Sequence, residues 1–329
     1  MAETPLNYAI ITGQGRSGTN WLLELLDQSP RTFCRNEPYG PAGSPMAELP
    51  DRLIIRNDFA DLAGRWDEVI EFLRRHLGER DQVLRAPKFY KHRISEALGL
   101  WRWIAGRRRR RLVTLLGSPV TGSQWQMPWW LGSRTRLRQA LLILKLVQSP
   151  GWVAFVLRHH PHVPIFHIIR HPGGFLNSWR NRWLATQDEA DVTRLNRQRL
   201  HDVAAETPRW GQLFGHIDEM GADEAELWYW RYANESLYEL GRSSPHYLQI
   251  VYEQLAADPV PIMQRVYQMC ELEWTDAVQA EVERVCSSSG SIAAKWRGAL
   301  TPAKIDLVDR ILAPSPMASW WTESPNQPA

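Results

Sequence analysis

Short apolar runs alternate with longer amphipathic segments along most of the chain. The first run, Tyr8–Thr12, passes through a glycine-rich turn into Trp21–Asp27, whose apolar residues repeat at helical spacing. Further apolar runs bounded by turn residues lie at Arg31–Cys34, Gln82–Arg85, Pro164–Ile169 and His246–Tyr252. Helical segments such as Trp66–Leu77 separate them. Strands that alternate with helices predict a three-layer α/β fold, with a mostly parallel central sheet of about five strands.

Two segments break this alternation. Residues 95–161 show no clear sheet strand and concentrate tryptophans and the basic run Arg107–Arg111, whereas residues 183–240 are polar and helical in pattern. We interpret both as helical insertions in a single domain that covers residues 1–313, and expect them to cap the functional site. The Pro/Ser-rich tail, 314–329, is expected to fray.

The composition is that of a folded globular protein. Of the 329 residues, 44% are hydrophobic and 23% are charged, and the net charge is +3. These values exclude a disordered chain, a collagen and a disulfide scaffold. Five of the 39 basic residues are lysines, which leaves 34 arginines. Because the arginine side chain is a planar fork suited to bidentate contacts, this bias points to local anion sites.

The sequence shows neither a secretory signal nor a membrane span, and its cysteines indicate a reducing compartment. Three cysteines without a Cys-x-x-Cys pair are typical of a reducing compartment. The N-terminus lacks a secretory signal pattern, and Lys145 and Pro150 interrupt the most apolar stretch, residues 141–157. We therefore expect a cytoplasmic protein without a membrane span.

The glycine-rich turn after the first apolar run carries the first chemical signal. Backbone N–H groups at the start of the following helix suit a phosphate. Gly13 and Gly18 have the spacing that opens a Walker A loop, but Thr19-Asn20 stand where that loop needs Lys and Ser or Thr. Gly13, Gly15 and Gly18 also fit the GxGxxG pattern of dinucleotide-binding proteins. The acidic residue that usually follows this pattern about 20 positions later is absent here. The turn is either a phosphate loop of another type or a purely structural turn.

Two motifs, each at a strand-to-helix junction, resemble the sulfotransferases that use 3′-phosphoadenosine-5′-phosphosulfate (PAPS). Gly15-Arg-Ser-Gly-Thr-Asn-Trp21 resembles the 5′-phosphosulfate loop of that family. The apolar run that ends at Arg170, with Ser178 eight residues on, is similar to the family's 3′-phosphate motif. The stretches from Tyr252 to Pro259 and from Lys295 to Leu300 are softer matches.

The resemblance implies a set of nucleotide-binding residues. They are Gly15, Arg16, Ser17, Gly18, Thr19, Asn20, Trp21, Arg170, Ser178, Tyr252, Lys295, Trp296 and Arg297. It also implies a P-loop-type fold, PAPS as the co-substrate, adenosine 3′,5′-bisphosphate as the product, and no required metal.

Sulfuryl transfer, like phosphoryl transfer, depends mainly on positioning and on stabilising charge. Arg16 is expected to stabilise the leaving phosphate. Glu37 is the expected general base, because family members with an arginine in the loop resemble this chain in having a Glu 21 residues further on; the alternative is an ordinary solvated or ion-paired Glu. Pro87 stands where aryl-type members have a catalytic His, and Arg85 or Lys88 is expected to contact the sulfate.

The acceptor is less defined by the sequence. Arginines suit anionic glycans and aromatic walls suit sugar faces, which favours a carbohydrate or glycolipid hydroxyl among small-molecule and glycan acceptors. No nucleic-acid partner is expected. The part of residues 95–161 that is rich in tryptophan and arginine, here called the Trp/Arg-rich segment, is a candidate for peripheral membrane contact. Two alternative functions stay open: a P-loop small-molecule kinase, and a non-enzymatic membrane- or RNA-associated module that uses this segment.

Overall fold

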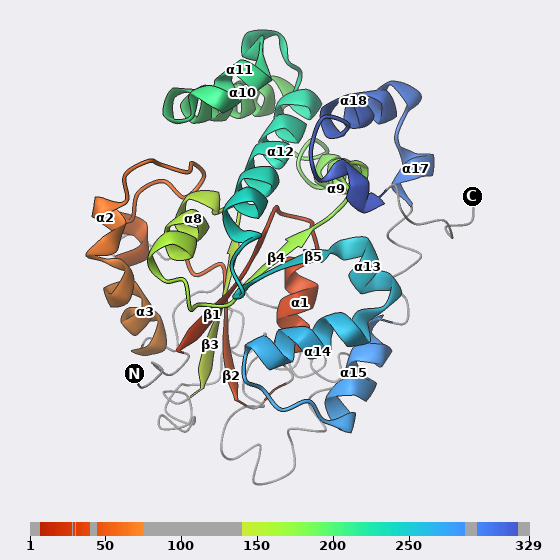
Figure 1. Ribbon diagram of the computed structural model, residues 1–329. Coiled ribbons are helices and arrows are strands. Elements are labelled where there is room, and N and C mark those ends of the chain that lie inside the picture. The colour runs from red at the N-terminus through yellow and green to blue at the C-terminus, as the bar shows by residue number, and fades with distance from the viewer. Residues whose placement is uncertain are drawn as a thin grey trace, which may run out of the picture.

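A sheet of five parallel strands forms the centre of the molecule. The computed structural model describes residues 7–27, 29, 31–39, 45–75, 140–286 and 295–321. The strands are β1 Tyr8–Gly13, β2 Thr32–Asn36, β3 Leu141–Val147, β4 Ile165–Ile169 and β5 Tyr247–Val251. They follow the order β2-β3-β1-β4-β5 (Figure 1). The expected α/β fold with a parallel central sheet is confirmed.

Side chains of the sheet alternate between two apolar layers. Ile10, Leu142 and Leu144 belong to one core, and Ile11 and Ile143 to the other. Because both faces are covered, the strands read as nearly continuous apolar runs rather than as alternating ones.

Helices cover both faces of the sheet (Figure 1). The first face is covered by η1 Pro45–Glu48, α2 Ala60–Ala63, α3 Trp66–Arg75 and α8 Pro150–His159. The second face is covered by α1 Thr19–Leu26, α13 Tyr252–Ala257, α14 Pro259–Met269 and α15 Asp276–Cys286. None of the helices in the described part of the chain is long and apolar enough to cross a membrane.

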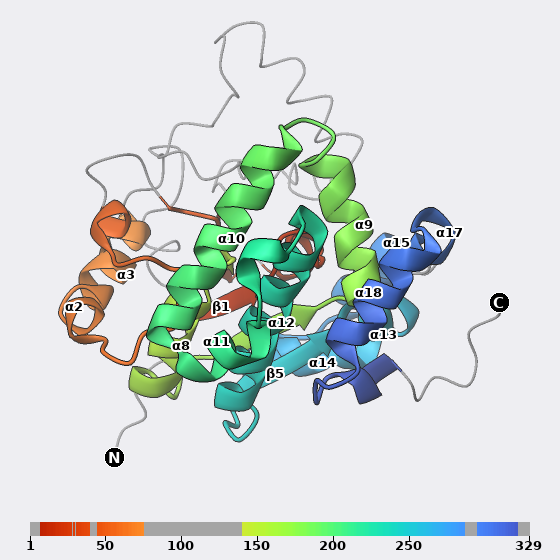
Figure 2. The same ribbon diagram turned by 90° about the horizontal axis from the view of Figure 1, so that it is seen from above.

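The helix α12, Ala222–Gly241, connects the sheet layers to a further group of helices. It contacts α8, α9, α10 and α18. The elements of this group are α9 Pro172–Arg182, α10 Glu189–Glu206, α11 Pro208–Phe214, η4 Ile217–Glu219, α17 Trp296–Ala299, α18 Pro302–Leu312 and η5 Ala318–Trp321. Figure 2 shows α10, α12 and α9 beside one another in the view from above.

The expectation that residues 95–161 contain no sheet strand is wrong. β3 lies in this range, between β2 and β1 in the sheet, and α8 follows it after two residues. Both elements are apolar and nearly continuous, so their pattern resembles a single long segment. The strand predicted at Gln82–Arg85 and the run Arg107–Arg111 lie outside the described residues. The expectation that the tail frays from residue 314 is wrong up to Trp321, because η5 lies there and the indole N–H of Trp321 donates to Glu253.

Candidate active site

The candidate site lies at the edge of the sheet where its parallel strands end. The glycine-rich loop follows β1, Glu37 follows β2, Arg170 follows β4 and Tyr252 follows β5. Ligands bind at this carboxyl edge in open α/β sheets. The strand order therefore brings together four segments that are far apart in the sequence.

The loop between β1 and α1 depends on two glycines. Gly13 and Gly18 have φ angles of +152° and +95°, which residues with a Cβ atom rarely adopt. A Cβ atom on Gly13 would lie 2.4 Å from the carbonyl oxygen of Ile168, and one on Gly18 would lie 2.6 Å from Cδ2 of Tyr252. The loop thus packs directly against the ends of β4 and β5.

The start of α1 is suited to an anion. Gly18 is its N-cap residue, and its first turn carries no acidic side chain. The first N–H groups of a helix have no intrahelical acceptor, and the helix dipole places positive charge there. The N–H groups of Thr19 and Asn20 are therefore suited to a phosphate or sulfate oxygen.

Arg16 connects the loop to α9 and to the end of β4. Its Nε donates a hydrogen bond of 2.9 Å to Oγ of Ser178. Arg170 donates from Nη1 to the carbonyl oxygen of Arg16 at 3.1 Å, and its guanidinium carbon lies 4.8 Å from the centre of the Tyr252 ring. The structure therefore brings together four residues that the sequence analysis assigned to one nucleotide site.

Positive charges lie close together in this group. Burial lowers the pKa of Arg16, and the nearby Arg170 and Arg182 lower it further. Nε of Arg170 and Oγ of Ser17 are buried and have no hydrogen-bond partner in the described part of the chain. Buried polar atoms without partners cost free energy, which a bound anion would relieve. Guanidinium groups, a hydroxyl and backbone N–H groups are donors typical of phosphate and sulfate sites.

Lys145 is a site residue that the sequence analysis missed. It lies in β3, opposite Ile11 of β1 and Asn36 of β2, and its side chain is 1% exposed. Its ammonium group donates to Oδ1 of Asn20 and to Oδ1 of Asn36, both at 2.6 Å, and forms an ion pair with Oε1 of Glu37. Burial lowers the pKa of Lys145, and the Glu37 carboxylate partly offsets this. The lysine thus ties the phosphate loop to the candidate base.

A signal for Lys145 is present in the sequence. It is a single charged residue within the apolar run Leu141–Val147, in a chain that has only five lysines. A charge in a buried strand needs polar partners, so it marks a polar site at that position. Arg85 and Lys88, the predicted sulfate-side cations, lie outside the described residues.

The other residues predicted to bind the nucleotide lie near Tyr252 and His171. The Trp21 ring lies edge-on to the Tyr252 ring, with 5.8 Å between centres. Trp296 stacks on His171 at 4.4 Å, whereas its neighbours Lys295 and Arg297 are exposed. The pKa of His171 is lowered to about 3 by burial, and further by Arg297 and Arg170.

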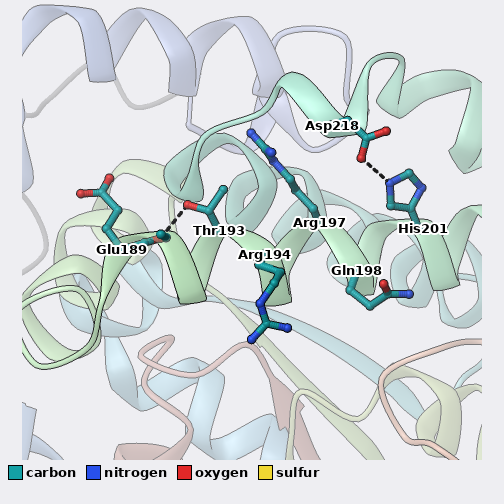
Figure 3. Close-up of a pocket in the computed structure, with 8 residues that line it drawn as sticks. Glu189, Thr193, Arg194, Arg197, Gln198, His201 and Asp218 are labelled. Atoms are coloured by element: carbon teal, nitrogen blue, oxygen red, sulfur yellow. Dashed lines mark hydrogen bonds and ion pairs between the residues drawn. The ribbon is translucent and has the colours of Figure 1, made fainter.

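A separate hollow of about 590 Å³ lies along α10 and η4. Figure 3 shows its lining, in which His201 contacts Asp218 at 2.9 Å. The acidic residues Glu189 and Asp218 and the basic residues Arg194 and Arg197 all line it. Because these opposite charges balance, the hollow lacks the positive excess of the loop site.

One comparison with known proteins identifies a family. A family model described as "Sulfotransferase family" matches residues 9–276, which is well over half of the chain. No curated protein is similar enough in sequence to count as a match.

Several solved structures match this chain at low sequence identity. The sulfotransferase domain of the olefin synthase from Synechococcus PCC 7002 has 17% identity and a TM-score of 0.44, over 93% of this chain and 94% of that chain. Sulfotransferase STF9 from Mycobacterium avium has 15% identity and a TM-score of 0.43, over 99% of this chain and 80% of that chain. Mouse sulfotransferase SULT7A1 complexed with PAP has 12% identity and a TM-score of 0.43, over 95% of this chain and 85% of that chain.

Proposed function

The chain belongs to the sulfotransferase family, and from this premise we propose that it transfers the sulfuryl group of PAPS to an acceptor hydroxyl. The observation that carries the proposal is the convergence of Arg16, Arg170 and Ser178 beside a phosphate loop. Their hydrogen bonds join three segments that a PAPS site requires in one place.

The donor set fits a nucleotide with phosphates at both ends. The loop N–H groups of Gly18, Thr19 and Asn20 would hold the 5′-phosphosulfate, whereas the Ser17 N–H donates to the carbonyl oxygen of Gln14 at 3.2 Å. Arg170 and Ser178 would hold the 3′-phosphate, which is supported by the free Nε of Arg170 in the described part of the chain. The Ser178 hydroxyl accepts from Arg16 and keeps its own hydrogen for donation.

Five further residues would complete the nucleotide site. Trp21 and Tyr252 lie beside the loop and Arg170, and their rings pack edge-on against each other. Lys295, Trp296 and Arg297 form the outer side, where two exposed cations stand beside a buried ring. No metal is part of this proposal.

In the proposed reaction the acceptor oxygen bonds to sulfur while the bond from sulfur to the phosphate oxygen breaks. The products are a sulfate ester and adenosine 3′,5′-bisphosphate. Arg16 stabilises the charge that develops on the leaving phosphate. Since arginine stays protonated, it acts through its charge and its hydrogen bonds rather than by giving up a proton.

Glu37 is the proposed base that takes the acceptor proton. Its Oε1 binds Lys145, and Oε2 has no partner within the described ranges. The side chain is 19% exposed, so it can reach an acceptor from solvent. We expect Glu37→Gln to lower kcat by about 10²- to 10⁴-fold and to leave the Kd of adenosine 3′,5′-bisphosphate unchanged, as calorimetry would show.

The acceptor side is proposed from the chain's composition and helical cap. We favour a carbohydrate or glycolipid hydroxyl, with residues 183–240 as the acceptor cap within a single domain of residues 1–313. Arg85 or Lys88 is proposed as a sulfate-side cation, and the Trp/Arg-rich segment as a peripheral membrane contact. A cytoplasmic location is part of the same proposal.

Nucleotide selectivity tests the proposed function. Adenosine 3′,5′-bisphosphate without metal is expected to raise the melting temperature of the protein, because it supplies both phosphates. ATP with Mg²⁺ is expected to have little effect, because the loop lacks the Walker lysine. If ATP with Mg²⁺ stabilised the protein and the bisphosphate did not, a kinase would replace the sulfotransferase proposal.

A further inference from the structure

Glu253, in the first turn of α13, joins two segments around the Arg170 turn. Its Oε1 accepts a hydrogen bond of 3.1 Å from the backbone N–H of His171, the residue after Arg170. Its Oε2 accepts a hydrogen bond of 3.0 Å from the indole Nε1–H of Trp321. One carboxylate therefore ties the C-terminal element η5 to the end of β4.

Aromatic packing reinforces this connection. The ring of His171 stacks on Trp296, with 4.4 Å between centres and 15° between planes. Trp321 meets the same ring edge-on at 5.2 Å and 82°, and also packs near Trp230 of α12 at 6.4 Å. The turn that carries Arg170 is thus held between two elements from the C-terminal part of the chain.

The residue before Glu253 supports Arg170 directly. The Tyr252 ring lies 4.8 Å from the guanidinium carbon of Arg170, and it also limits the space beside Gly18. Tyr252 therefore supports the guanidinium group, while Glu253 fixes the backbone from which this side chain extends. Two adjacent residues after β5 thus contact the guanidinium group of Arg170 and the backbone next to it.

We propose that Glu253 and Trp321 are positioning residues that hold Arg170 in the orientation in which it binds the 3′-phosphate of the donor. This inference rests on the proposed function, because that function supplies the 3′-phosphate. It assigns to η5, at the C-terminal end of the described chain, a role in nucleotide recognition without direct contact to the nucleotide.

Two conservative variants separate this role from general packing. Trp321→Phe keeps an aromatic ring and removes the N–H donor to Glu253. Glu253→Gln keeps the size of the side chain, but its amide nitrogen cannot accept a hydrogen bond, so at most one of the two bonds survives. Trp320→Phe is the matched control for packing, because Trp320 lies in the same element and packs on Tyr238 and on Trp321, with 4.9 Å and 5.7 Å between centres, while the bond from Trp321 to Glu253 stays in place.

The test compares the Kd of adenosine 3′,5′-bisphosphate with that of adenosine 5′-monophosphate, which lacks the 3′-phosphate, by calorimetry on the full chain. Trp321→Phe and Glu253→Gln should each raise the Kd of the bisphosphate by about tenfold and that of the monophosphate by less than about twofold. The double variant should lose less affinity for the bisphosphate than the sum of the two single losses, because both changes act through the same carboxylate. Trp320→Phe should bind both nucleotides like the wild type.

Equal weakening of both nucleotides would overturn the inference, because it would indicate a general packing role. Unchanged binding in both folded variants would overturn it as well, provided that the wild type prefers the bisphosphate. If the wild type bound adenosine 3′,5′-bisphosphate no more tightly than adenosine 5′-monophosphate, the proposed 3′-phosphate site would be contradicted. The positioning role of Glu253 and Trp321 would then be contradicted as well. Thermal unfolding of each variant shows that it is folded.

Discussion

The three ammonium hydrogens of Lys145 match three acceptors, one each on Asn20, Asn36 and Glu37. A buried ammonium group is stable only when its hydrogens are bonded in this way. These bonds fix two residues of the site at once, since Asn20 starts α1 and Glu37 is the proposed base. At the residue scale, the site is therefore built around a cation that contacts both the loop and the base.

Replacement of this cation should reduce turnover more than nucleotide binding. Lys145→Met leaves the Glu37 carboxylate without its ion-pair partner, and we expect kcat to fall by about 10²-fold or more. The Kd of adenosine 3′,5′-bisphosphate should change far less, because Arg16 and Arg170 remain. Steady-state kinetics and calorimetry would measure the two effects.

Lys304 provides a control for the loss of a lysine ion pair. Its Nζ lies 3.0 Å from Oδ2 of Asp223, in the α12 and α18 region. Lys304→Met should leave kcat close to the wild-type value. If both variants lost the same fraction of activity, the specific role of Lys145 would be refuted.

At the scale of elements, the loop packs closely on Tyr252 because Gly18 has no Cβ atom. Gly18→Ala would place a Cβ atom 2.6 Å from Cδ2 of Tyr252 at a φ of +95°. We expect the free energy of unfolding to fall by about 1–3 kcal/mol, measured by urea denaturation. Binding of the bisphosphate should weaken as well, since the same two residues border its proposed site.

Gly64 offers a matched comparison. It has a φ of −80°, and a Cβ atom there would meet nothing within 4 Å. Gly64→Ala should therefore change the free energy of unfolding by less than about 0.5 kcal/mol. A loss as large as that of Gly18→Ala would show that the proposed clash with Tyr252 is not the cause.

The buried His167 of β4 makes stability depend on pH. Its Nδ1 lies 2.6 Å from the Tyr247 hydroxyl, its Nε2 lies 3.0 Å from Oδ1 of Asn234, and burial lowers its pKa to about 4. The unfolded chain, with a His pKa near 6.5, binds a proton first as the pH falls. The stability that His167 contributes is therefore complete above that value and is lost as the pH falls toward 4.

Comparison with His167→Gln isolates this contribution. Between pH 7 and pH 5, the wild type should lose about 2 kcal/mol more of its free energy of unfolding than the variant. Buried Glu226 and Glu253, whose pKa values are raised, act in the opposite direction but are common to both proteins. Parallel urea titrations at the two pH values would check this, and equal losses would contradict it.

Elements with a strong local pattern could be predicted from the sequence, and long-range connections could not. The strand, loop and helix around Gly18 are contiguous, and so are β4, Arg170 and α9. β3 was missed because its run merges with the apolar helix α8. The bond from Trp321 to Glu253 spans 68 residues, so only the folded chain reveals it.

At the scale of the whole molecule, strand order assembles the site. β1 and β4 are neighbours in the sheet although α8 and more than a hundred residues separate them in the chain. This arrangement places Arg16 beside Arg170 and gives a molecule with a net charge of only +3 a concentrated positive site. Two of the chain's 34 arginines, Arg16 and Arg170, thus form part of this anion site.

The central claim is that this edge recognises a 3′-phosphorylated nucleotide through Arg170. Calorimetry of the wild type and Arg170→Ala with adenosine 3′,5′-bisphosphate and adenosine 5′-monophosphate tests it most directly. The wild type should prefer the bisphosphate by about 10- to 100-fold, as expected for hydrogen bonds to a charged group, and Arg170→Ala should lose that preference. A folded Arg170→Ala protein that keeps the full preference would contradict the account.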